Sequence, residues 1–256
     1  MIEIKNMYSG YGRREILHEV SLCVNDGELV VILGPNASGK STLFRTVMNI
    51  VQMSSGTITV DGESVAELDA RALAKCVSYL PQVSKITDIT VLELALLGRY
   101  SHLPFPRKYR EEDLHIASDA VESVGLSGME DVPISLLSGG MRQKAFVAMS
   151  ISQSANNLLF DEPTAHLDVS SSLQIMQIMR NLADEGRAVA VVMHDVILAL
   201  HTADKIAVMK DGNIVCFGAP EDSSVISAIK DSLGVLPIRL HDTPMADFCL
   251  PYRKDV

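Results

Sequence analysis

The stretch that most constrains this chain is GPNASGKST, residues 34–42, which stands between two strongly apolar patterns. The preceding run ELVVIL is typical of a buried strand, and the following TLFRTVMNIV repeats apolar residues at helical spacing. A strand, a small-residue loop and a helix in this order predict an α/β core. The positions that satisfy the pattern G-x-x-x-x-G-K-[ST] are Gly34, Gly39, Lys40 and Ser41.

The small residues of this loop predict a phosphate site. They allow backbone N–H groups to turn inward around an anion, and the following helix directs its positive end at the same place. Lys40 brings a point charge to the β- and γ-phosphates, and the Ser41 hydroxyl is placed to ligate Mg²⁺. We therefore expect a nucleoside triphosphate here, held by Gly34, Pro35, Asn36, Ala37, Ser38, Gly39, Lys40, Ser41 and Thr42.

A second element is NLLFDEP, residues 157–163, an apolar strand pattern that ends in Asp161 and Glu162. Such a strand delivers two carboxylates to the carboxyl edge of the sheet, where ligands bind in open α/β folds. Asp161 is placed to orient the water shell of a metal, and Glu162 to polarise an attacking water. Together with the phosphate loop, the pair predicts a hydrolytic site.

The organisation of the chain follows from its patterning. Its 256 residues, 47% of them apolar, suit one domain with subdomains. Strand and helix patterns alternate around the loop, which predicts a mostly parallel sheet, and the opening residues predict an antiparallel sheet. We expect one domain over 1–256, with a nucleotide-binding core at 1–82 and 154–221 and a helical subdomain at 83–153. The extension at 222–256 reads as a helix and one weak strand.

Charge, cysteines and apolar runs exclude other classes. The net charge of −10 and the pI near 5.1 argue against nucleic acid as a partner. The cysteines lack the paired spacing of a zinc or redox site and predict free thiols; they are Cys23, Cys76, Cys216 and Cys249. The apolar runs are shorter than the roughly 18–20 residues of a membrane span, and no secretory signal is present. We therefore expect a soluble, cytoplasmic chain.

The stretch LLSGGMRQKAFVAMSIS, residues 136–152, precedes LLFDEPTAHLD along the chain. This order resembles the ATP-binding cassette (ABC) ATPases, whose LSGG signature stands ahead of the strand that ends in Asp-Glu. By motif, the resemblance extends from Tyr11 to His194 and therefore covers most of the chain. It implies a P-loop NTPase core, ATP as the substrate and Mg²⁺ as the cofactor.

The signature residues Ser138, Gly139 and Gly140 stand just before a helix-like run and offer another small-residue helix start suited to a phosphate. In the family, that phosphate belongs to the nucleotide held by the opposite subunit. The resemblance therefore implies a head-to-tail pair of chains with two ATP molecules at the interface.

Four more residues match family motifs. Tyr11 fits the aromatic residue that stacks on adenine, although an exposed edge-strand tyrosine is the alternative. Gln82 fits the glutamine that senses Mg²⁺ and water. Asp168 fits the loop that couples the two active sites, and an N-cap of the following helix is an equally good local interpretation. His194 fits the histidine that contacts the γ-phosphate, against a purely structural histidine.

The resemblance thus implies two residue sets within the nucleotide site. The catalytic set is Glu162, His194, Gln82 and Lys40. The metal set is Ser41, Gln82 and Asp161.

Two positions depart from the family pattern. Members usually carry Gly at position 37, and a methyl group at φ > 0 costs about 1–2 kcal/mol. We expect Ala37 to lie at a permissive angle. Members usually carry Gln or Glu at position 141, so Met141 removes a polar contact across the interface. We therefore expect weaker ATP-driven pairing and an active but modest ATPase.

Within the family, TDITVLELALLGRYSHLP and FGAPED resemble the ATPases of iron–siderophore, haem and vitamin B12 importers. This implies a peripheral subunit on the cytoplasmic side of the membrane, with permease subunits docking near 83–110 and an extracytoplasmic substrate-binding protein acting indirectly. The run VLELALL with Phe105 suggests a docking face, with core packing as the alternative. Arg99 and Tyr100 are expected near it. ATP would hold the pair closed, and hydrolysis would release it.

Three other functions stay open at this point. A soluble cassette ATPase of a cytosolic machine, such as iron–sulphur cluster assembly, would lack an importer-like coupling segment. A regulator or DNA-maintenance module would carry a long coiled coil or tandem cassettes. A binding-only cassette would have lost hydrolytic residues, yet Glu162 and His194 are both in place.

Overall fold

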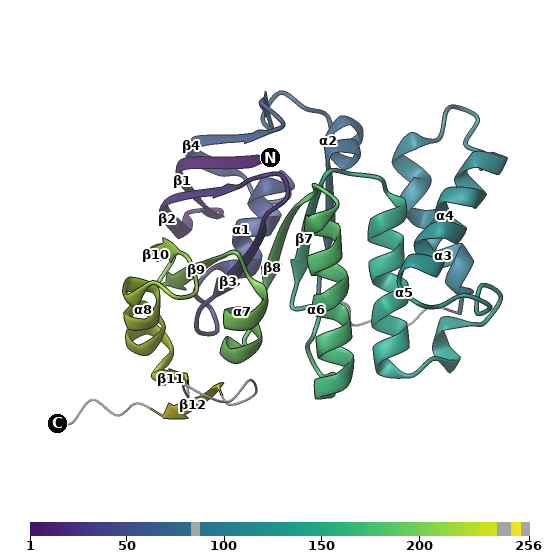
Figure 1. Ribbon diagram of the computed structural model, residues 1–256. Helices are drawn as coiled ribbons and strands as arrows, with labels where there is room; N and C mark the ends of the chain where they lie inside the picture. Colours follow the sequence, from purple (N-terminus) through teal and green to yellow (C-terminus); the bar gives the residue numbers. More distant parts are fainter. Residues whose placement is uncertain (83–87, 240–246, 252–256) are drawn as a thin grey trace.

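The structure is a computed structural model that describes residues 1–82, 88–239 and 247–251. Its strands form an antiparallel sheet near the N-terminus, a larger mostly parallel sheet and a C-terminal hairpin (Figure 1). The antiparallel sheet has the order β2-β1-β4-β5. Its strands are β1 (Ile2–Tyr11), β2 (Arg14–Val24), β4 (Met53–Val60) and β5 (Glu63–Ser64). The predicted antiparallel opening is confirmed.

The larger sheet has the order β10-β9-β3-β8-β7-β6, with β10 antiparallel at one edge. Its strands are β3 (Leu29–Leu33), β6 (Val77–Leu80), β7 (Asn157–Asp161), β8 (Ala188–Val192), β9 (Lys205–Lys210) and β10 (Asn213–Gly218). Strands β3, β7 and β8 are buried along their whole length, as expected of parallel strands covered on both faces. The predicted α/β fold is confirmed.

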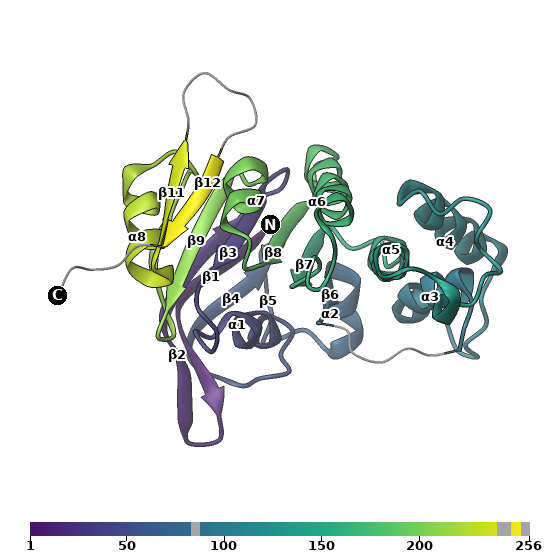
Figure 2. The same ribbon diagram turned by 90° about the horizontal axis from the view of Figure 1, so that it is seen from below.

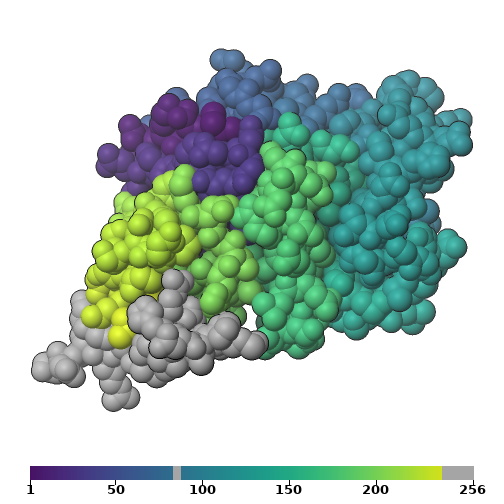
Figure 3. Space-filling view, in the orientation of Figure 1, coloured from purple at the N-terminus to yellow at the C-terminus, as the bar shows by residue number. Residues whose placement is uncertain are grey.

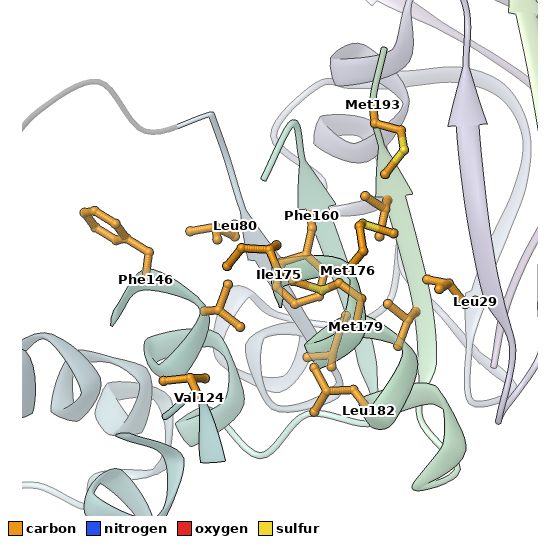
Figure 4. Packing of buried hydrophobic residues seen from close by; sticks show 14 of the residues in the cluster. Leu29, Leu80, Val124, Phe146, Phe160, Ile175, Met176, Met179, Leu182 and Met193 are labelled. Carbon is orange, nitrogen blue, oxygen red and sulfur yellow. The ribbon is translucent and has the colours of Figure 1, made fainter. Parts of the chain in front are cut away.

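The two faces of this sheet support separate hydrophobic cores. In β3, Val30 and Ile32 join the core that includes α1 and the antiparallel sheet, whereas Leu29, Val31 and Leu33 join the core beneath the other helices. This alternation is the period-2 pattern of a strand. Figure 4 shows the second core, where side chains of α6 and α5 meet the sheet. Its methionines fill the core, as the sequence predicted.

The helices cover both faces and extend the molecule on one side. They are α1 (Lys40–Val47), α2 (Ala70–Cys76), α3 (Val91–Leu97), α4 (Glu111–Ser123), α5 (Gly139–Ser152), α6 (Val169–Asp184), α7 (Val196–Thr202) and α8 (Ser223–Leu233), with 3₁₀ turns η1 (Gly98–His102) and η2 (Ile134–Leu136). Helices α3, α4 and α5 pack on one another beside the sheet (Figures 1 and 2). In the space-filling view they form the side of the molecule opposite α8 (Figure 3). The domain boundaries given above stay a prediction.

Arg99 lies inside this helical group, not on its surface. Its side chain is 5% exposed and its Nε donates to Asp113, which is fully buried, over 3.1 Å. Its Nη1 also donates to the carbonyl of Ser152 and the hydroxyl of Ser154, both at 2.9 Å. Hydrogen bonds from Arg110 and Arg99 lower the pKa of Asp113, although burial acts against them. Arg99 itself therefore offers no surface to a docking partner, and its expected place near the docking face stays a prediction.

Most of the run VLELALL is core. Within α3, the residues Val91, Leu94, Ala95 and Leu96 are buried, so the core-packing alternative holds for them. Leu97 at the end of the helix is half exposed, and Phe105 is 94% exposed. Only this end of the helix, with the turn after it, offers apolar surface. In the part of the chain that the structure describes, no helix has the length and apolar character of a membrane span.

The C-terminal extension contains two strands, where one was expected. After α8, β11 (Val235–Arg239) pairs with β12 (Asp247–Pro251) in an antiparallel hairpin, and β12 lies beside α7 (Figure 2). Pro237 and Pro251 obscure the strand pattern, because proline inside a short run is typical of a strand break. Among the cysteines whose side chains are described, Cys23, Cys76 and Cys216 are free thiols, as predicted.

Candidate nucleotide site

The sheet topology brings four predicted site residues to one edge. Strands β3, β8, β7 and β6 are consecutive neighbours and run parallel, so the loops after them emerge at the same edge. Gly34 follows β3, His194 follows β8, Asp161 ends β7 and Gln82 follows β6. Ligands of open α/β folds bind at this carboxyl edge.

The loop before α1 needs its glycines. A Cβ atom on Gly34 would lie 2.4 Å from the carbonyl oxygen of Met209, so any side chain would force the loop away from β9. Gly39 is the N-cap residue of α1 with φ of 104°, a conformation that other residues rarely adopt. The first turn of α1 leaves its N–H groups without partners inside the helix. The Ser38 hydroxyl is also buried without a hydrogen-bond partner. These donors fit a bound phosphate.

Ala37 does not lie at a permissive angle. Its φ of 63° is in the left-handed region, so the expectation is wrong and the loop keeps the conformation that favours glycine. The strain of about 1–2 kcal/mol is accepted in this loop. A residue in such a region persists when the surrounding structure determines its backbone, here the close contact of Gly34 and the cap at Gly39.

Lys40 lies across the loop with its side chain buried. It is 5% exposed, and its Nζ donates to the carbonyls of Gly34 at 2.8 Å and Pro35 at 2.9 Å. Burial lowers the pKa of Lys40, against the opposing effect of the Glu162 and Asp161 carboxylates. The ammonium group is therefore held at the loop, beside the start of α1.

Asp161 and Ser41 form the part of the site that fits Mg²⁺. The Ser41 hydroxyl donates to Asp161 Oδ1 over 3.1 Å, and the Tyr79 hydroxyl donates to Oδ2 over 3.3 Å. Burial raises the pKa of Asp161, and these two hydrogen bonds act in the opposite direction. The described residues contain no group of three or more His, Cys, Asp or Glu placed to hold a metal. One carboxylate and one hydroxyl suit Mg²⁺, which keeps several waters and binds substrate phosphates.

Glu162 is the centre of a second cluster. Its Oε1 lies 2.7 Å from His194 Nε2, and its Oε2 accepts a hydrogen bond from Gln82 Nε2 over 3.0 Å. Its φ of 54° is unusual for glutamate and turns the chain sharply after β7, while its N–H remains bonded to the carbonyl of Val192. The structure thus brings together three residues far apart in sequence. Their catalytic roles stay a prediction.

The signature residues lie in a different place. Ser138 caps α5 by accepting a hydrogen bond from the N–H of Met141 over 3.3 Å, and Ser138 and Gly139 are exposed. A Cβ atom on Gly140 would lie 2.6 Å from the Ser171 hydroxyl at the start of α6. Within the described residues, no hydrogen bond joins this segment to the phosphate loop.

Asp168 lies beside the signature segment. It caps α6, because its carboxylate accepts from the Ser171 N–H at 2.8 Å and the Ser171 hydroxyl at 2.9 Å. The local N-cap interpretation is therefore confirmed, and hydrogen bonds from Ser171 lower the pKa of Asp168. A role in coupling two active sites stays a prediction.

Tyr11 ends β1 with its ring about half exposed. Its hydroxyl accepts a hydrogen bond from Arg45 Nη1 over 3.4 Å. Exposure suits both an adenine platform and an edge-strand tyrosine, so the choice stays a prediction. Sequence reasoning missed Arg45 and Tyr79, although both lie among the predicted site residues. The available signals were the spacing of Arg45 one helical turn after Ser41 and the position of Tyr79 on the strand before Gln82.

The profile of the ABC transporter family matches residues 17–165. This chain belongs to the ABC transporter family. It is 34% identical over 248 residues to the petrobactin import ATP-binding protein YclP of Bacillus subtilis, covering 94% of this chain and 96% of that protein. It is 33% identical over 239 residues to the ferric enterobactin transport ATP-binding protein FepC of Escherichia coli, covering 93% and 88%.

A solved dimeric ATP-binding cassette, in a post-hydrolysis state bound to ADP and Pi, matches with a TM-score of 0.73. It is 26% identical and covers 87% of this chain and 100% of that chain. ABC transporter ATP-binding proteins are ATPases that use ATP with Mg²⁺, and this chain is one of them. The recognised family, the enzyme class and the cofactor expected from sequence are confirmed.

Proposed function

We propose that this chain is the ATP-hydrolysing subunit of an importer, peripheral on the cytoplasmic side of a membrane, whose cargo is an iron chelate, haem or a cobalamin-type molecule. The observation that carries the proposal is the meeting of Lys40, Asp161 and Glu162 at one sheet edge in a member of the ABC family. The cargo class is supported by the petrobactin and ferric enterobactin importers, to which the chain is similar over most of its length.

In this proposal, the loop and the carboxylates divide the chemistry. Lys40 and the free N–H groups at the start of α1 bind the β- and γ-phosphates. Ser41 and Asp161 would hold Mg²⁺, which supplies charge neutralisation on the phosphates when bound. Glu162 accepts the proton of the attacking water, and its bonds to Gln82 and His194 orient its carboxylate.

The exposed signature supports pairing of two copies. Ser138 and Gly139 present a helix start to solvent. Leu136 just before them, and Val169 and Leu173 on α6, are exposed apolar side chains. A cavity of about 410 Å³ beside Val169 and Leu173 extends to Glu162 and His194. A second copy seated on this face would bring its loop to the first copy's signature and cover the apolar side chains.

Permease docking is proposed at the end of α3. A groove of about 340 Å³ is lined by Ala70, Arg71, Ala74, Leu97, Tyr100 and Arg107. Exposed Leu97, Tyr100 and Phe105 supply apolar surface, and Arg107 stacks on the Tyr100 ring at 4.2 Å. The start of the expected segment, residues 83–87, lies outside the described residues. A short amphipathic helix fits such a groove, because its apolar face covers the exposed rings.

The soluble-machine alternative is not favoured. The relatives named above are import or transport ATP-binding proteins, and their similarity extends over nearly the whole of this chain.

The test is affinity purification of the tagged chain from gently solubilised native membranes. Recovery with a polytopic membrane protein is the expected result, and the variants Leu97→Asp and Phe105→Asp should lose it while the basal ATPase is kept. Leu114→Asp, on an exposed position of α4, is the matched control and should keep the partner. Recovery with soluble proteins alone would contradict the importer and leave the ATPase standing.

A further inference from the structure

A polar chain joins the two ends of the nucleotide site. Asp161 accepts from Ser41 on one oxygen and from Tyr79 on the other, at 3.1 and 3.3 Å. Arg45 donates to the Tyr11 hydroxyl at 3.4 Å, and its guanidinium lies near enough to the Tyr79 hydroxyl to interact with it electrostatically. The order is therefore Tyr11, Arg45, Tyr79, Asp161 and Ser41, which begins at the expected adenine platform and ends at the expected metal ligands.

The packing around Tyr79 supports a role beyond filling space. Its ring meets Phe44 of α1 edge to face, with centroids 6.2 Å apart, so α1 and β6 hold the ring in place. The Tyr79 hydroxyl donates to Oδ2, which leaves Oδ1 toward Ser41. Hydrogen bonds of this kind orient metal ligands and tune their affinity.

Arg45 is suited to connect the two halves. It stands four residues after Ser41 on α1, so the two side chains lie on the same face of the helix. The hydrogen bond to Tyr11 and the nearby Tyr79 hydroxyl raise the pKa of Arg45, and the guanidinium stays charged. Its planar donors can hold two hydroxyl groups at once.

We propose that Tyr79 and Arg45 are positioning residues that orient Asp161 toward Mg²⁺ and couple metal binding to the seating of the base on Tyr11. The inference rests on the proposed function, since it concerns the same nucleotide site. Neither residue needs to touch the substrate. By linkage, Mg²⁺ would then strengthen nucleotide binding partly through this chain of hydrogen bonds.

The test measures binding of a nonhydrolysable ATP analogue to the full chain by calorimetry, with Mg²⁺ and with EDTA. For Tyr79→Phe we expect the Mg²⁺-dependent gain in affinity to fall by about tenfold, as for other partners of metal ligands, with unchanged affinity in EDTA. Arg45→Met should reduce the same gain and also weaken binding in EDTA, because Tyr11 loses its tether. The double variant should resemble Arg45→Met, since both changes cut one chain.

Tyr8→Phe is the matched control, because it also removes a tyrosine hydroxyl, but from β1 and outside the chain that runs from Tyr11 to Ser41. This variant should bind the analogue as the unchanged protein does. Thermal unfolding of each variant checks the fold. If Tyr79→Phe lost the same affinity for the analogue with Mg²⁺ as with EDTA, or lost none, the inference would be overturned. The proposed function would still stand in that case, provided that the unchanged protein binds the analogue. Failure of the unchanged protein to bind the analogue would instead overturn the proposed function.

Discussion

The start of α1 and the start of α5 use the same device, small residues ahead of a helix, in two different surroundings. At α1 the loop is enclosed: Lys40 and Ser38 are buried, and Asp161 approaches from β7. At α5 the residues Ser138 and Gly139 are exposed, with only the cap of α6 nearby. The first helix start is enclosed with a lysine and two carboxylates, whereas the second lies open beside the capping carboxylate of Asp168.

Under the proposed function, this difference means that one chain holds a complete phosphate site and half of another. A helix start alone attracts an anion weakly, because its partial charge is screened by water. In the proposed function, the α1 site adds Lys40, the Mg²⁺ ligands Ser41 and Asp161 and the general base Glu162, and these groups supply both affinity and chemistry. The α5 start gains strength only when a second surface excludes water from it.

Glu162→Gln should break the complete site most severely. The amide keeps the shape and the contact with Gln82 but cannot accept a proton, so we expect turnover to fall by about 10³-fold, within the usual range for a lost general base. Binding of ATP should persist. Steady-state ATPase assays measure the effect, with Glu185→Gln on the exposed end of α6 as the matched control. A fall of less than tenfold would show that Glu162 is not the base.

Arg99→Met should destabilise the group of helices that carries α5. Removal of the guanidinium leaves the fully buried Asp113 without its buried partner, and we expect a loss of about 3–5 kcal/mol in the free energy of unfolding. Arg110→Met removes the half-exposed partner of the same carboxylate and should cost about 1 kcal/mol or less. Urea unfolding compares the two. An equal or larger loss in Arg110→Met would contradict the burial argument.

Gly139→Ala and Gly140→Ala distinguish the contribution of the α5 start to stability from its contribution to ATPase activity. A methyl group on Gly140 meets Ser171 at 2.6 Å, so this variant should lose about 1–3 kcal/mol of stability. A methyl group on Gly139 meets only Leu167 at 3.7 Å, which is ordinary contact, and should leave stability unchanged. Both should lower the ATPase about tenfold if a phosphate approaches this surface closely.

Thermal unfolding measures the loss of stability, and ATPase assays on the same preparations measure the loss of activity. Ser171→Gly should restore stability to Gly140→Ala, because it removes the side chain that the methyl group meets. Unchanged ATPase in Gly139→Ala would contradict the half-site at α5.

Part of the site follows from the sequence, and part depends on contacts that only the fold creates. The loop, Asp161 and Glu162 were predictable, because they follow strands whose apolar runs are short and unmistakable. Their meeting at one edge followed from parallel strand order. Arg99 was not predictable, because its partners come 14 to 55 residues later, on α4, at the end of α5 and in the turn after α5, and an arginine after an apolar run looks exposed. Tyr79 was missed for the same reason, since its partner is on β7.

Ala37→Gly should have the smallest effect, and it tests how much the loop before α1 depends on the residue at position 37. At φ of 63°, glycine relieves about 1–2 kcal/mol of strain but adds freedom to the unfolded chain, which costs roughly 0.4–1 kcal/mol. We therefore expect a net gain of about 0.5–1 kcal/mol in stability. Ala66→Gly, at an exposed position without positive φ, should instead lose roughly 0.4–1 kcal/mol. Chemical unfolding of both variants distinguishes a gain in the free energy of unfolding from a loss. A loss of stability in Ala37→Gly would mean that the loop conformation differs from a glycine loop. A gain of stability with unchanged ATPase activity would show that the enclosing residues, and not the residue at position 37, hold the phosphate-binding shape.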